Sequence, residues 1–153
     1  MRIAALAAGL VLLGAPALAL AQQPPPEQPI PNDGGWRLSR VAGSGCFARL
    51  PGPQVDTLLA ANKDGKMVVG AGRGDWNLPN GQENVTLQID GGAVYPIKAS
   101  PVGNVIFGVV PDAAMEDALR KAQQLTWTMP AGRFTANVAG LGTAFDAIKA
   151  CLR

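Results

Sequence analysis

Cys46 and Cys151 are the two cysteines of a 153-residue chain that contains no histidine. A catalytic thiol or a serine hydrolase would need an activating base, which is most often histidine. A tetrahedral zinc site would need more cysteine or histidine ligands than this chain has. The residue types therefore favour a disulfide between Cys46 and Cys151 over a reactive thiol or a metal centre.

Acid–base chemistry would have to come from carboxylates. Glycoside hydrolysis needs two of them on opposite sides of one bond. The candidates are Asp56, Asp75, Glu83 and Asp90. No spacing singles out a pair, so an enzymatic role stays open without support from the sequence. We expect a protein that is not an enzyme and that carries no cofactor or metal.

Residues 70–76, GAGRGDW, form the most glycine-rich string in the mature chain. A dinucleotide loop would have to open a helix, but NLPNG follows, which is turn chemistry. If the chain has a binding loop, the best candidates are Arg73, Asp75 and Trp76, because Arg and Trp often anchor interfaces. The alternative for Trp76 is a lid folded back over the core. Residues 73–75 also form an Arg-Gly-Asp tripeptide, which integrins recognise, but nothing else points to an adhesin.

The N-terminus predicts export. Residues 1–21 combine Arg2, an apolar stretch and an Ala-Leu-Ala cleavage site, which together are typical of a secretory signal peptide. Residues 22–35 are proline-rich and predict a flexible tether, and residues 36–153 predict one globular domain. No segment approaches the ~20 apolar residues that cross a bilayer. We expect an exported protein, located in the bacterial periplasm, with no transmembrane segment in its mature form.

Charge excludes two classes of partner. The formal net charge is +2, and the charged residues are mixed in sign and scattered. Nucleic acid would need a basic stripe, and an anionic membrane surface would need a polybasic patch. Neither is present in the sequence, so we expect a protein or another envelope component as the partner.

Short apolar runs separated by Gly, Pro, Asn and Asp predict a β-rich domain. Expected strands cover 36–42, 46–50, 55–61, 66–71, 84–90, 93–99, 105–110, 125–129 and 134–138. In the first, Trp36, Leu38 and Val41 are expected inside, although the alternation slips near Arg40. Turns at 62–65 and 91–92 predict two hairpins, and the run at 105–110 predicts a central strand.

Two helices complete the expected fold. Asp112 predicts the N-cap of the first, whose apolar stripe is Met115, Ala118, Leu119 and Ala122. The second begins near Thr143 and carries Ala144, Ile148 and Cys151 on one face, so that Cys151 could meet Cys46. The fold class is mainly β (α+β): an antiparallel β-sandwich-like domain with two short helices, the C-terminal one tethered to the sheet by the disulfide.

The order of Trp36, Cys46, residues 140–144 (GLGTA), Ile148 and Cys151 resembles small periplasmic proteins of alphaproteobacteria. It is similar in layout to the invasion-associated locus B family. The resemblance implies a periplasmic β-rich domain with a terminal disulfide, and a link to host-cell invasion without an established activity.

Taken together, the sequence predicts a non-enzymatic exported domain that binds its partner through residues 73–80. The alternative is an inhibitor of an exported hydrolase, such as a protease or lysozyme, because a small disulfide-closed β domain can present one rigid loop.

Overall fold

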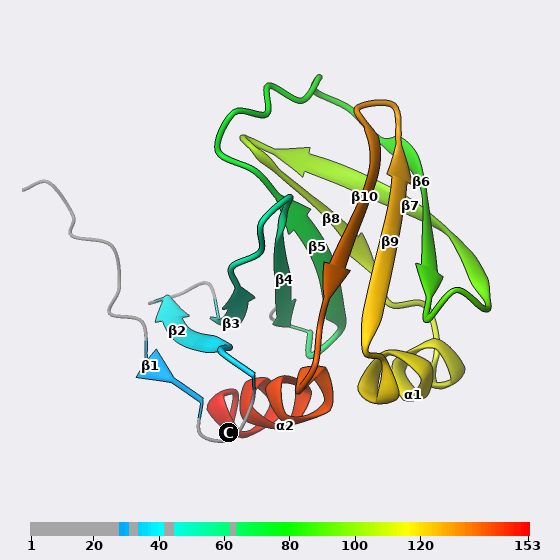
Figure 1. The fold of residues 1–153 in the computed structure, drawn as a ribbon. Coiled ribbons are helices and arrows are strands. Elements are labelled where there is room, and N and C mark those ends of the chain that lie inside the picture. Colours follow the sequence, from blue (N-terminus) through cyan, green and yellow to red (C-terminus); the bar gives the residue numbers. More distant parts are fainter. Residues whose placement is uncertain (1–27, 31–33, 42–44, 62–63) are drawn as a thin grey trace, which may run out of the picture.

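The computed structural model describes residues 28–30, 34–41, 45–61 and 64–153, in which ten strands form one antiparallel sheet accompanied by two helices (Figure 1). The strands are β1 (Gln28–Pro29), β2 (Arg37–Val41), β3 (Gly45–Leu50), β4 (Asp56–Ala61), β5 (Met67–Gly72), β6 (Glu83–Ile89), β7 (Val94–Val102), β8 (Val105–Val109), β9 (Gln124–Met129) and β10 (Gly132–Asn137). The helices are α1 (Ala113–Lys121) and α2 (Leu141–Cys151).

Most neighbours in the sheet are also neighbours in the chain. The strand order is β1-β2-β3-β4-β5-β8-β7-β6-β9-β10, so two junctions, β5–β8 and β6–β9, join strands that are not consecutive. We call these two junctions the seams. Both expected hairpins are confirmed, since β4 pairs with β5 and β6 pairs with β7. The strand predicted to be central, β8, lies inside the order between β5 and β7.

The sheet curls so that its two halves share one core. The inward rows include Leu59 on β4, Leu87 on β6 and Trp127 on β9, all fully buried. Thr135 on β10 donates its backbone N–H to Gln54 Oε1 in the β3–β4 connection at 3.2 Å, which brings the far edge of the sheet back to the first half. Figure 1 shows β9 and β10 passing in front of β7, to the right of β4 and β5. The two layers expected of a sandwich are therefore made by one continuous sheet.

The helices pack side by side beneath the curled sheet (Figure 1). Asp112 caps α1 as predicted, since its Oδ1 accepts the backbone N–H of Met115 at 2.9 Å. The helix α2 begins at Leu141, two residues before the predicted start, after Gly140 adopts a left-handed conformation. A Cβ at Gly142 would lie 2.6 Å from the carbonyl oxygen of Arg120, so the helices approach closely at this glycine.

Charged side chains also join the two helices. Glu116 Oε1 accepts hydrogen bonds from Lys149 at 2.5 Å and from Arg120 at 3.1 Å, and Arg120 bonds Asp146 at 2.8 Å. The Lys149 ammonium, followed by Arg120, holds the pKa of Glu116 below its ordinary value. Asp146, followed by Glu116, raises the pKa of Arg120. These ion pairs join α1 to α2 in addition to the close approach at Gly142.

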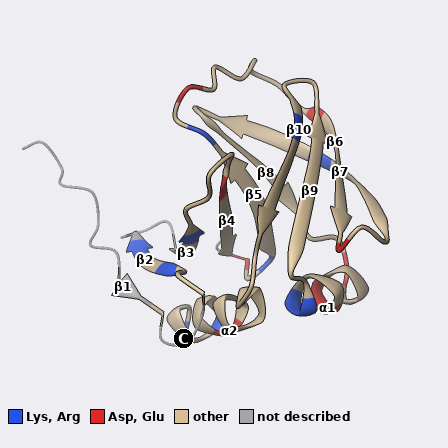
Figure 2. Ribbon diagram, in the orientation of Figure 1, with Lys and Arg blue, Asp and Glu red and all other residues tan. Residues whose placement is uncertain are grey.

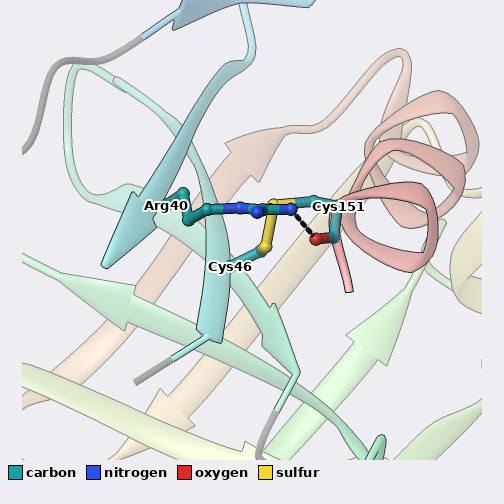
Figure 3. The surroundings of a disulfide bond; sticks show 3 residues. All are labelled: Arg40, Cys46 and Cys151. Carbon is teal, nitrogen blue, oxygen red and sulfur yellow. Dashed lines mark hydrogen bonds between the residues drawn. A yellow bond between two sulfur atoms is a disulfide. The ribbon is translucent and has the colours of Figure 1, made fainter. Parts of the chain in front are cut away.

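The predicted disulfide is confirmed. Cys46 on β3 bonds Cys151 at the end of α2, across 105 residues of sequence and a Cα–Cα distance of 6.2 Å. Arg40 lies beside the sulfur atoms and donates hydrogen bonds to the Cys151 carbonyl oxygen and, at 3.5 Å, to its Sγ (Figure 3). The guanidinium thus satisfies a carbonyl at the C-terminal end of the helix, where a cation is favoured.

The first strand differs in part from its prediction. Trp36 is buried as expected, and its indole N–H donates to the Ala139 carbonyl oxygen at 3.1 Å. Leu38, however, is only half-buried, whereas the neighbouring Ser39 is buried. The side chain of Val41 lies outside the described residues, as does the whole range 1–21.

Part of the range expected as a tether makes contacts with the domain. Gln28 and Pro29 form β1 and pair with β2, and Ile30 is buried with its backbone N–H bonded to the Trp36 carbonyl oxygen at 3.0 Å. Among the described residues, neither helix is long and apolar enough to cross a bilayer.

Candidate functional site

The predicted binding loop leaves the sheet at the end of β5. Its first residue is held to the β7–β8 turn, because the Arg73 backbone N–H donates to the Asn104 carbonyl oxygen at 3.1 Å. Trp76 then closes a tight turn by donating its backbone N–H to the Arg73 carbonyl oxygen at 3.0 Å. These two hydrogen bonds fix the position of Arg73 relative to the sheet.

Trp76 occupies the lid position that the sequence left open. It is half-buried against the core, and its ring centroid lies 5.2 Å from that of Phe134 on β10 at an interplanar angle of 57°. A tilted aromatic pair at this separation is favourable. Trp76 therefore anchors the loop across the end of the curled sheet and does not project beside Arg73.

Arg73 and Asp75 stay on the surface. Their side chains are 43% and 63% exposed, and they bond each other through two hydrogen bonds of 2.6 and 2.7 Å. Figure 2 shows blue and red stretches of ribbon close together on the loop that follows β5. The hydrogen bond from Arg73 lowers the pKa of Asp75, and the same bond raises the pKa of Arg73. A bidentate guanidinium–carboxylate pair holds both groups in one orientation. The loop therefore presents one positive and one negative side chain, each held in place by the other.

Beside this loop, the outward side of β3, β4, β5 and β8 is apolar. The register places Leu58 opposite Gly70 and Gly70 opposite Phe107. A Cβ at Gly70 would lie 2.7 Å from Cδ1 of Phe107, so the ring rests on the bare backbone of β5. Gly72 offers the same space to Val105, whose Cγ2 would be 3.0 Å away. Because the two glycines have no side chains, Phe107 and Val105 pack directly against the backbone of β5.

A shallow hollow of about 340 Å³ lies where this apolar surface meets the loop. We call it the outer-face hollow: its floor and rim include Phe47, Arg49, Asp56, Leu58, Arg73 and Val105. Arg49 on the rim bonds Asp56 at 2.8 Å. A second concavity of about 420 Å³, beside residues 52–55, shares Asp56 and Gly72–Gly74 with the first. Apolar surface with a charged rim is typical of interface cores.

The carboxylates considered for glycoside hydrolysis have structural partners in three of four cases. Asp56 bonds Arg49 and the backbone N–H of Gly52, and Asp75 bonds Arg73. Asp90, at a positive φ of 49°, accepts the backbone N–H groups of residues 123 and 124 at 2.9 and 2.8 Å. A general acid needs a raised pKa, whereas the pKa of Asp75 is lowered.

Sequence reasoning identified the loop but missed the surface beside it. A half-exposed strand should alternate apolar and polar residues, yet the outward positions of these strands carry Phe47, Leu58, Val68 and Phe107. That departure from alternation was visible in the sequence. Without the strand order, however, it could not be told from a strand buried on both faces.

Comparisons with known proteins place the fold. No family model matches the sequence, and no curated protein matches it. The structure is similar to the crystal structure of invasion associated protein B from Bartonella henselae, with a TM-score of 0.50 and 23% sequence identity. The match covers 75% of this chain and 92% of that one. At this identity the likeness concerns the fold, and it agrees with the resemblance to the invasion-associated proteins expected from the sequence.

Proposed function

We propose that this protein is a non-enzymatic, exported binding domain of the bacterial periplasm. It holds a protein partner against residues 73–76 and the outer-face hollow. The observation that carries the proposal is the apolar outer surface of β3, β4, β5 and β8, which borders a braced, charged loop. Half-buried Phe47, Leu58 and Val105 meet exposed Arg73 there. The disulfide fits an oxidising compartment outside the cytoplasm.

The chemistry of this surface suits a protein partner. Interfaces are built around a water-excluding apolar centre, and arginine is enriched among the residues that carry binding energy. Because Trp76 and the Arg73–Asp75 pair already fix the loop, little conformational entropy is lost when a partner binds. The partner should present an apolar segment to the hollow and a carboxylate or carbonyl oxygen to Arg73.

The experiment is a crosslinking pull-down from periplasmic extract with the full chain as bait, followed by identification of the captured protein and measurement of its affinity. Arg73→Ala should weaken binding by about tenfold or more, and Val105→Lys should abolish it. Lys121→Ala is the matched control, because Lys121 is an exposed cation on α1 and does not line the hollow, and it should bind like wild type.

Two outcomes would overturn the proposal. One is a partner whose affinity is unchanged in both the Arg73 and the Val105 variants. The other is turnover of a substrate that is lost on substitution of a single carboxylate. A captured hydrolase that loses its activity on binding would identify the partner class as an exported enzyme and the role as inhibition, because a rigid loop is also what an inhibitor presents.

A further inference from the structure

The strand β7 is longer than the neighbour that should cover it. Residues 94–99 of β7 pair with β6, from Gln88↔Val94 to Glu83↔Ala99. On its other side, β8 pairs with it only from Ala99↔Gly108 to Val102↔Val105. Figure 1 shows β7 and β8 parting beyond this point. Residues 94–98 therefore form a strand edge that has no partner among the described strands.

The ladder fixes which backbone groups face this free edge. Ile89 donates its backbone N–H to the Ala93 carbonyl oxygen at 3.1 Å, which marks the first hydrogen-bonded pair of the β6–β7 hairpin. Hydrogen-bonded and non-bonded pairs alternate along an antiparallel ladder. The backbone groups of Val94, Pro96 and Lys98 therefore point away from β6, toward the open side.

The middle residue of this edge cannot donate. Proline has no N–H, so the free edge offers three carbonyl oxygens but only two donors. The side chains of Val94, Pro96 and Lys98 are all exposed, and the exposed fraction of Val94 is 56%. Proline and lysine are the residues that natural sheets place on edges to prevent unwanted strand pairing.

We infer that Pro96 keeps this edge closed to strand addition by a second copy of the same chain. If two copies related by a twofold axis paired along the whole free edge, Pro96 would lie opposite Pro96 and Val94 would lie opposite Lys98. The central pair would normally make two hydrogen bonds, and both are missing because neither proline has a donor. Sliding one strand by two residues would place Pro96 opposite Lys98, where one of the two hydrogen bonds is again missing because proline cannot donate.

The test restores the donor. Pro96→Thr supplies the missing N–H and a residue that favours strands, and we expect self-association roughly thirtyfold tighter than in wild type. Sedimentation velocity over a concentration series measures the change. Amide hydrogen exchange locates it, because Val94 and Lys98 should become protected in the dimer. Pro101→Thr is the matched control: Pro101 lies on the same strand, but its backbone points away from β8 at the paired end, so this variant should not dimerise.

Circular dichroism verifies that each variant is folded, and Lys98→Thr gives a second perturbation that leaves Pro96 in place. It should strengthen association less than Pro96→Thr does. The inference is overturned if Pro96→Thr associates no more tightly than wild type. It is equally overturned if wild type is already a dimer with protected Val94 and Lys98 amides, since Pro96 would then not close the edge.

Discussion

Breaking the disulfide should remove a large share of the stability of this domain. The crosslink joins residues 105 apart, so the chain-entropy model gives it about 4.8 kcal/mol at 25 °C. Whole domains of this size are stable by about 5–15 kcal/mol. We therefore expect Cys46→Ala/Cys151→Ala to lower the melting temperature by about 15–25 °C.

Urea unfolding followed by tryptophan fluorescence is the direct assay, because Trp36 and Trp127 are fully buried. Reduced wild type is the control that isolates the crosslink, since it keeps both sulfur atoms in the core. If oxidised and reduced wild type differ by less than about 1 kcal/mol in unfolding free energy, the reasoning is refuted. The stabilisation would then have to come from packing of α2 alone.

Two further predictions concern the contact between the helices. Gly142→Ala should destabilise the domain by about 1–3 kcal/mol in urea unfolding, although alanine favours helices, because its Cβ would meet the Arg120 carbonyl oxygen; Gly74→Ala, which has open space, should be neutral. Glu116→Gln should flatten the acid limb of the stability curve measured by urea unfolding from pH 6 to pH 3. Since the folded pKa of Glu116 is lowered, its contribution is complete above the unfolded value near 4.5 and is lost as the pH falls through the folded value. An unchanged acid limb in Glu116→Gln would contradict the role of its contact with Lys149.

The parts of the fold that follow from local chemistry could be predicted from the sequence. Asp112 caps α1 because a short acidic side chain reaches the N–H groups of the first turn. Cys151 lies on the same helix face as Ile148 by simple periodicity, which was enough to bring it toward Cys46. Both results depend on neighbours within one helical turn.

The slip near Arg40 has a tertiary cause. The register pairs Arg40 with buried Cys46, so Arg40 stands on the core side of the sheet although its own side chain is exposed. The C-terminal end of α2 lies beside Arg40, and the Arg40 guanidinium donates a hydrogen bond to the Cys151 carbonyl oxygen there. No local pattern in the sequence could show that a helix terminus, 111 residues away, would meet this strand.

The candidate site divides in the same way. The turn residues around Arg73 and Asp75 indicate from the sequence that both lie in a loop. The direction of the Trp76 side chain, in contrast, depends on its contact with Phe134 on β10. The outer-face hollow depends on β8 returning beside β5, so that Val105 lies against Gly72. Sequence reasoning identifies residues, but the strand order decides which of them share a surface.

The two seams have a consequence for how this domain folds. Every other strand pair in the described sheet is a local hairpin, whereas each seam must close a loop of more than thirty residues, as in Gly72↔Val105 and Ile89↔Leu125. Closing a flexible loop of that size costs about 3 kcal/mol of chain entropy before any new contact forms. Hairpins should therefore assemble early, and the seams should set the folding rate. Trp127 lies opposite Leu87 at the second seam, so its fluorescence in stopped-flow refolding should report the closure of that seam.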